Sequence, residues 1–340
     1  MPARQSRRRI CPRLLLGKWP SSSSDPRQPE IPLLTLSAPE LVARRAPTPG
    51  PMAQPPQPGP VFKVLHRTVF DYDAPVRDSI NTLHLEPRTF PFQRTLSAVV
   101  KVLPATRVRR FHDLFENVTH HFEVPGDHRR LEIESRIRIQ NLPLVVPESD
   151  QKALLHEYRG DDIPERTWAY LQDSPFVSRN PYVWRQALDI TSGIGPVFEQ
   201  AVAIMHWIHA NFRYQAGTTN VSTRIEEAFA LRRGVCQDFT HVMLGLCRAV
   251  GIPARYASGY LYNGPRDSLV GAQASHAWPE VFFPSVGWIG FDPTNETLAD
   301  ERYIKIAVGR DYDDVAPVKG SYHGNGHGKM SVSVEVEKVD

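Results

Sequence analysis

The apolar residues of this chain follow the period of strands in one part and that of helices in another, which restricts it to a mixed architecture. Between residues 61 and 140 the period is two, and Leu131, Ile133, Ile137 and Ile139 alternate with charged residues. This alternation is typical of half-buried strands, and turn residues separate the successive runs. We therefore expect an antiparallel β domain with one solvated face.

Beyond a proline-containing connector at residues 141–185, the period becomes helical. An apolar stripe predicts a helix over 197–212, with Pro196 suited to its first turn. The spacing Thr-Arg-Ile-Glu at 223–226 is that of a capping box. It predicts a second, short helix that ends near Gly234.

A third helix is predicted from about Cys236, because a regular buried face follows it until Gly251 and Pro253 stop the helix. Helices followed by several strands indicate an α+β domain. The runs with strand character are 254–262, 274–283, 288–292, 303–308 and 330–338.

Prolines and charges divide the chain at about residue 60. The first 60 residues hold 14 of the 31 prolines and have a net charge of +6, whereas residues 61–340 have 31 basic and 34 acidic residues. The slightly acidic body argues against nucleic-acid binding, which calls for a basic face. The tail cannot bury enough apolar surface to offset its ordering entropy, so we expect it to be disordered.

Three interpretations of the tail stay open: a transit peptide, a basic arm for nucleic acid or membrane, and a segment without function, which we favour. Met52 is a candidate translation start. The short apolar run at 14–16 does not favour secretion, and no run approaches the ~20 residues of a membrane span.

The three cysteines, Cys11, Cys236 and Cys247, are too few for a disulfide framework. If Cys236 and Cys247 share one helix, they lie about 16 Å apart at 1.5 Å per residue, which is too far to bridge. Free thiols indicate a reducing compartment, and we expect the cytoplasm.

Cys236 is the candidate nucleophile, because unpaired backbone N–H groups and the helix dipole favour an anion in the first turn of a helix. Its own N–H is a candidate oxyanion donor. The alternative is a small buried hydrophobe, which is the interpretation we give Cys247 in mid-helix.

A thiol nucleophile needs a base and an orienting partner. His276 and Asp292 lie on two strands of an expected hairpin with a four-residue loop at 284–287. That loop places Asp292 opposite Pro279 and on the other face from His276, so we expect a bulge at Pro279 to bring them together.

At this point the sequence resembles the transglutaminase-like superfamily of papain-like Cys-His-Asp proteins. The core motifs are Gly-Val-Cys-Gln-Asp-Phe at 234–239, Ser-His-Ala-Trp at 275–278 and Phe-Asp-Pro-Thr at 291–294. Upstream, His-Arg-Thr-Val-Phe-Asp-Tyr at 66–72 and Asp-Leu-Phe-Glu-Asn at 113–117 resemble the β-rich N-terminal domain of its bacterial branch. Glu116 departs from that branch, which commonly has Gly there.

The tail at 1–60 lies outside this resemblance, which implies a β-rich domain at 61–145 and a papain-like core at 146–340, in which the cysteine-bearing helix packs on an antiparallel sheet. It implies a triad of Cys236 as nucleophile, His276 as general base and acid, and Asp292 as orienter. The reaction would be acyl transfer through a thioester, without a cofactor.

Other candidates carry weaker signals. Tyr214, Gln237 and Trp278 are candidate substrate contacts, although a tyrosine at the core edge and a strand tryptophan are commonly packing residues. His206 and His209, for which we find no cysteine or acid partner, suggest a solvated or stacking role rather than a metal site. His120 with His121 and the Gly/His segment at 323–327 are weak metal signals, and a flexible loop explains the latter. Asp311, Asp313 and Asp314 lack the spacing of a calcium loop.

The sequence therefore favours an enzyme that hydrolyses amide or peptide bonds in a protein or peptide substrate. Transamidation, in which a primary amine resolves the acyl-enzyme, stays open, as does a non-catalytic papain-like binding module. We expect no metal, nucleic-acid or membrane partner, and the sequence does not indicate an oligomeric state.

Overall fold

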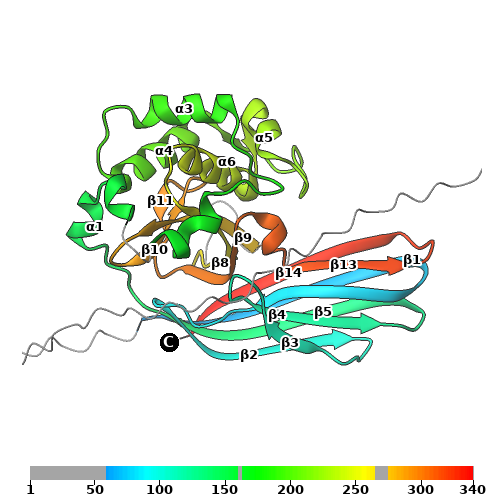
Figure 1. Cartoon of the computed structure of the whole chain (residues 1–340). Coiled ribbons are helices and arrows are strands. Elements are labelled where there is room, and N and C mark those ends of the chain that lie inside the picture. Colours follow the sequence, from blue (N-terminus) through cyan, green and yellow to red (C-terminus); the bar gives the residue numbers. More distant parts are fainter. Residues whose placement is uncertain (1–58, 160–162, 265–274, 340) are drawn as a thin grey trace, which may run out of the picture. The chain divides into compact units, whose positions relative to one another are not determined.

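The computed structural model describes residues 59–159, 163–264 and 275–339 (Figure 1). The expectations for the tail, including Cys11 and Met52, lie outside these residues. Seven antiparallel strands, most of them from the N-terminal part of the chain, form one β structure, which we call the β region. Its strands are β1 (Val61–Glu86), β2 (Gln93–Leu103), β3 (Arg109–His112), β4 (Val118–Val124), β5 (His128–Asn141), β13 (Val318–His323) and β14 (Gly328–Val339).

The long strand β1 belongs to two groups of strands. Its first half pairs with β5 and β14, and its second half pairs with β4 and β13. Apolar residues from both groups meet in one core, because every second residue of each strand points inward. They include Leu83, Val102, Phe122 and Ile133. Of the alternating residues seen in the sequence, Leu131 and Ile133 lie in this core, whereas Ile137 and Ile139 pack in a second cluster shared with the core sheet.

The C-terminal strands correct the expected domain boundary. We placed all of residues 146–340 in the core, but β14 pairs with β1 along its length, from Val61 opposite Val339 to Tyr72 opposite Gly328. The local pattern predicted this strand without indicating its partner. The last strands of the chain thus complete the sheet that begins it.

The core places helices over a five-stranded antiparallel sheet of order β11-β10-β9-β8-β12, in agreement with the predicted α+β class. Helices α3, α4 and α5 pack on α6, and α6 packs on β8 and β9 (Figure 1). The strands are β8 (Ala254–Leu261), β9 (Ser275–Phe283), β10 (Gly287–Asp292), β11 (Thr297–Leu298) and β12 (Tyr303–Gly309). The helices are α1 (Glu148–Lys152), α2 (Ile163–Thr167), α3 (Pro181–Thr191), α4 (Val197–Asn211), α5 (Ile225–Leu231) and α6 (Cys236–Ala249).

All three predicted helices are present: α4 and α6 lie where the apolar stripes placed them, and α5 lies between them. The capping box predicted for the helix between them is wrong. Arg224 is the N-cap of α5 and makes no side-chain capping bond. The Thr223 hydroxyl instead accepts the Asn220 N–H, and Glu226 accepts the Ser178 hydroxyl.

The β region and the core sheet share buried contacts. Phe62 and Ile139 pack with Tyr260 and Ile304 in one apolar cluster. The Asn117 side chain links the β region to strand β12 of the core sheet. It donates to the Val308 carbonyl at 2.7 Å and accepts the Val308 N–H at 2.8 Å. In the described ranges, no helix has the length and apolar character to cross a bilayer.

Candidate active site

Cys236 is the first residue of α6, and the local sequence explains why the helix begins there. Val235 is extended, and its N–H donates to Asp238 Oδ2 at 2.7 Å. A carboxylate in the first turn that reaches back in this way stops the chain from winding earlier. Because Cys236 is the first helical residue, its own N–H has no acceptor within the helix.

The two described cysteines have different surroundings. Cys236 is partly exposed, whereas Cys247 is fully buried in the core on the same helix. Burial raises the pKa of the Cys247 thiol to about 12. Cys247 therefore stays a neutral, inaccessible thiol, and Cys236 is the thiol that solvent and substrates can reach.

The β9–β10 hairpin has a register that the sequence did not predict. Phe283 pairs with Gly287 rather than with Trp288, so the loop has three residues, and Gly287 follows it with a positive φ of 86°. Glycine adopts this conformation at no steric cost, and a three-residue loop followed by a left-handed residue is a common hairpin connection.

This one-residue difference brings His276 and Asp292 to the same face. The last pair of this ladder is Gly290 with Glu280. If the same register continues for two more residues, Asp292 lies opposite Trp278, which is two positions from His276 on β9. Such diagonal neighbours share a face of the sheet. The bulge expected at Pro279 is absent from both ladders of β9, and Pro279 pairs regularly with Tyr256.

His276 and Asp292 are in direct contact. His276 Nε2 lies 2.7 Å from Asp292 Oδ2, and neither side chain is exposed. Asp292 also accepts the N–H of Thr294, the side-chain amide of Asn295 and the hydroxyl of Tyr303. Burial alone would raise the pKa of Asp292, but His276 and these donors hold it below its usual value.

The protonated form of His276 is strongly favoured. Burial opposes the charge, but Asp292 and, in the same direction, Cys236 raise the pKa of His276 to about 10. His276 Nδ1 is buried and has no hydrogen-bond partner among the described residues. With Nε2 occupied by Asp292, Nδ1 is the ring atom available to the thiol.

The candidate substrate contacts divide into two groups. Tyr214 is 36% exposed, and both burial and the nearby Cys236 raise its pKa. Gln237 is buried and donates to the Val221 carbonyl at 3.1 Å. Trp278 is 1% exposed and packs between His276 and Tyr303. Tyr214 is thus the member of this set that a substrate can reach beside the thiol.

Two partners of Asp292, Asn295 and Tyr303, were missed by the sequence reasoning. Asn295 follows Asp292 in the same turn, and an Asx residue there is a usable signal. Tyr303 comes from β12, and its role depends on how the sheet folds back. Nothing in its local sequence indicates that role.

The prediction that His206 and His209 lack an acid partner is wrong. His206 Nδ1 lies 2.8 Å from Glu296 Oε1, and His209 Nε2 lies 3.7 Å from Glu296 Oε2. Glu296 belongs to the turn that follows Asp292, so these histidines connect α4 to that turn. The described residues contain no group of three or more His, Cys, Asp or Glu side chains suited to a metal ion.

The other weak metal candidates have structural partners. His120 pairs with Glu86 in the β region. Asp311 accepts the Phe176 N–H and caps the turn at Tyr312–Asp314. The Gly/His segment forms the connection between β13 and β14, where the His327 N–H donates to Asp73.

Comparison with known proteins agrees with this architecture. Residues 185–293 match the model of the transglutaminase-like superfamily, and residues 62–140 match that of the bacterial transglutaminase-like N-terminal region. An uncharacterized protein of Mycobacterium leprae is 34% identical over 281 residues, which cover 82% of this chain and 99% of that protein. The chain belongs to the transglutaminase-like superfamily.

Two further proteins are similar to this transglutaminase-like chain, one over most of its length and one over a short segment. A candidate cysteine protease from Cytophaga hutchinsonii has a crystal structure with a TM-score of 0.67 and 24% identity, covering 83% of this chain and 91% of that one, and it supports the fold alone. A protein-glutamine gamma-glutamyltransferase of Pseudomonas aeruginosa is 38% identical over 78 residues, 22% of this chain and 12% of that protein.

Proposed function

We propose that this transglutaminase-like protein is a thiol-dependent acyl-transfer enzyme that acts on amide bonds of proteins or peptides. The observation that carries the proposal is the His276–Asp292 contact. It leaves the second ring nitrogen of His276 available beside Cys236, at the start of a helix. In the proposed triad, Cys236 is the nucleophile, His276 the general acid and base, and Asp292 the orienting residue.

The proposed reaction begins with attack of Cys236 Sγ on the amide carbonyl carbon. A C–S bond forms, and the carbonyl π electrons move to oxygen, toward which the Cys236 N–H is a candidate donor. The tetrahedral adduct then breaks its C–N bond. His276 gives its Nδ1 proton to the leaving nitrogen, which departs as an amine, and a thioester remains.

The second half of the reaction reverses these proton transfers. Water or an amine attacks the thioester while His276 accepts its proton, and the C–S bond breaks to restore the thiolate and imidazolium pair. The strong bias of His276 toward its protonated form suits an ion pair with a thiolate, as expected for a papain-like site. Asp292 holds the ring so that Nδ1 faces the reacting atoms.

Hydrolysis is the activity we favour, and transamidation is the second candidate. The segment shared with the Pseudomonas gamma-glutamyltransferase supports the second candidate. The two differ only in whether water or a primary amine resolves the thioester. A glutamine-containing peptide library incubated with and without an added primary amine separates them, because mass spectrometry distinguishes a hydrolysed product from an amine conjugate.

Alkylation by iodoacetamide as a function of pH tests the triad directly. A Cys11→Ser background removes the labelling of Cys11, and Cys247 is buried, so Cys236 reports the signal. We expect labelling well below the range in which a free thiol ionises, about pH 8.5. We expect the profile to shift toward that range in His276→Ala. Ordinary labelling that is unchanged in this variant would refute the triad and support a non-catalytic module.

A further inference from the structure

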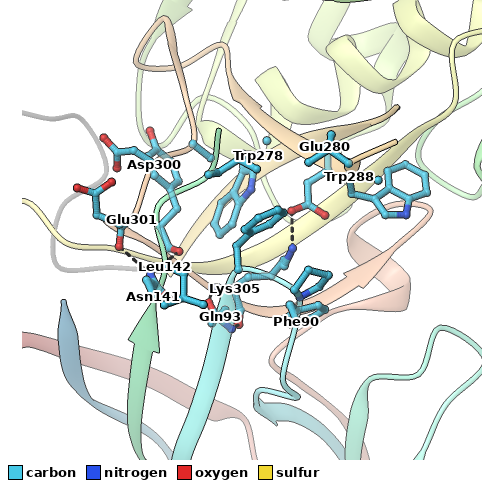
Figure 2. Close-up of a pocket in the computed structure, with 18 of the residues that line it drawn as sticks. Phe90, Gln93, Asn141, Leu142, Trp278, Glu280, Trp288, Asp300, Glu301 and Lys305 are labelled. Atoms are coloured by element: carbon cyan, nitrogen blue, oxygen red, sulfur yellow. Dashed lines mark hydrogen bonds and ion pairs between the residues drawn. The ribbon is translucent and has the colours of Figure 1, made fainter. Parts of the chain in front are cut away.

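A partly open cavity of about 250 Å³, lined by both polar and apolar side chains, lies at the junction of the core sheet with the β region, next to Trp278 and Tyr303, which pack on His276 (Figure 2). Its lining includes Phe90, Gln93, Trp278, Glu280, Trp288 and Lys305, but neither Cys236 nor His276. The cavity therefore does not include the proposed nucleophile or its base. The proposed acyl transfer gives this cavity no role.

The backbone is arranged to aim Lys305 into the cavity. The pairing of β8 with β12 slips between Lys305 and Ala307, so that Ile306 is an extra residue in β12. Such a bulge redirects the side chains around it. The Gln93 side chain fixes the bulge from the β region, because it donates to the Lys305 carbonyl at 2.6 Å and accepts the Lys305 N–H at 2.7 Å.

The buried charged side chains on this side of the cavity, Arg255, Glu280 and Lys305, have a net positive charge. Glu280 is paired with both Arg255 and Lys305, each at 2.6 Å, and all three side chains are largely buried. Two cations therefore share one carboxylate. A buried net charge is costly unless another group offsets it, so the wall favours an anion in the adjacent space.

Lys305 is the cation with capacity to bind that anion. Arg255 is committed to Glu280 and lies over the Trp288 ring at 4.3 Å. In the described part of the chain, Lys305 Nζ contacts one carboxylate oxygen, of Glu280, and lies 4.3 Å from the centre of the Phe90 ring. An ammonium group has three N–H donors, so donors remain for a ligand oxygen.

The rest of the lining limits the kind of anion. Trp278, Trp288 and Phe90 give aromatic walls, which suit a flat apolar body. Asp300 and Glu301 also line the cavity and would repel a multiply charged ligand such as a phosphate dianion. We propose that the cavity is a binding site for a small organic monocarboxylate, with its carboxylate on Lys305 Nζ and its apolar body against the tryptophans.

The location gives the site a physical connection to the triad residues. Trp278 stacks on His276 with ring centres 6.0 Å apart, and the Tyr303 hydroxyl donates to Asp292. Both side chains also line the cavity. A ligand there would touch the two side chains that pack against His276 and Asp292, without contacting Cys236 or His276 itself.

Titration of the full chain with sodium benzoate tests the proposal, with neutral benzamide as the isosteric control. Binding is followed by calorimetry and by tryptophan fluorescence, because Trp278 and Trp288 line the cavity. We expect saturable one-to-one binding of benzoate and at least about tenfold weaker binding of benzamide, which lacks the charge. Since no turnover is measured, the result is independent of the proposed acyl transfer.

A matched pair of variants assigns the site. Lys305→Met should weaken benzoate binding at least about tenfold, whereas Lys101→Met, on the exposed face of β2, should leave it unchanged. Absence of saturable benzoate binding at millimolar concentration would overturn the proposal. Equal affinity for benzamide, or equal affinity in Lys305→Met, would overturn it as well. The benzamide comparison needs only the native chain, so it holds even if Lys305→Met does not fold.

Discussion

Asp292 Oδ2 accepts two hydrogen bonds, one from His276 Nε2 at 2.7 Å and one from the Tyr303 hydroxyl at 2.8 Å. One carboxylate oxygen thus connects strands β9, β10 and β12 at the point where the candidate active site is built. The arrangement fixes the orientation of the imidazole from behind, and its other nitrogen is left for Cys236. Substitutions at Asp292 and Tyr303 should therefore have separable effects.

Asp292→Asn should remove most of the activity while preserving the fold. The amide is the same size, but it lacks the negative charge that raises the pKa of His276 and that orients the ring. In a comparable triad this change costs about 10⁴-fold in kcat, so we expect a loss of about 10³-fold or more here. Peptide turnover together with circular dichroism measures both consequences.

The pH profile of alkylation provides the control for this variant. With the Asp292 charge removed, the raised pKa of His276 should fall and the profile of Cys236 labelling should move toward that of a free thiol. The exposed acid Asp189 is a suitable comparison, and Asp189→Asn should change neither turnover nor labelling. Full activity in Asp292→Asn would contradict the orienting role.

Tyr303→Phe should have a smaller effect on activity and a clear effect on stability. The ring stays in its buried position against Trp278 and His276, but Asp292 loses one of its donors. Hydrogen bonds to charged groups contribute about 1.5–3 kcal/mol. Urea unfolding should show a loss in this range, and turnover should fall by about tenfold or less because His276 still contacts Asp292.

Removal of the whole ring distinguishes packing from hydrogen bonding. Tyr303→Ala also opens a cavity in the core, so it should destabilise by about 3–5 kcal/mol, more than Tyr303→Phe. If the two variants were equally stable, the packing of this ring would not contribute as the structure indicates.

The sequence predicted those parts of the site that depend on local patterns. Cys236 at a helix start follows from the apolar stripe of α6, which is nearly all buried. The contact of His276 with Asp292 depends on a single residue of loop length. The conformational freedom of Gly287 decides that length, and the motif alone gave the wrong register.

The sequence alone could not predict which distant strands pair, and the reason is physical. A strand pattern states which residues are buried but not which strand covers them, so β14 was found while its partner β1 was not. Tyr303 and Gln93 were missed for the same reason. Each makes its decisive hydrogen bond to an element brought near only by the complete fold.

Asn117→Ala should destabilise the protein strongly, although Asn117 is far in sequence from the core. Its amide satisfies both the N–H and the carbonyl of Val308, and it is fully buried. Truncation leaves two buried peptide groups unpaired, at about 1–3 kcal/mol each. We expect a total loss of about 2–6 kcal/mol in the free energy of unfolding, measured by urea titration.

Asn211→Ala is the matched control for this prediction. Asn211 ends α4 in an exposed position, where its side chain donates to the Trp207 carbonyl. Its substitution should change stability by no more than about 0.5 kcal/mol. Comparable losses in the two variants would show that the Asn117 bridge does not hold the β region to the core.

Stability should fall between pH 6.5 and pH 4, and His66 should account for much of the loss. His66 is buried between the Tyr260 hydroxyl and Thr68 Oγ1, and burial lowers its pKa from 6.5 to about 4. Below pH 6.5 the unfolded chain takes up a proton that the folded chain does not, so acid favours unfolding. The shift corresponds to about 3 kcal/mol at most.

His66→Gln isolates this contribution, because glutamine keeps hydrogen-bonding groups and does not titrate. The variant should lose less stability than the native protein between pH 6.5 and 4, as measured by urea unfolding at each pH. His241, whose pKa is lowered to about 3 by burial, should keep some acid sensitivity in place. His156→Gln, at an exposed position, should leave the native pH dependence unchanged. A His66→Gln profile parallel to the native one would exclude His66 as the source of the acid sensitivity.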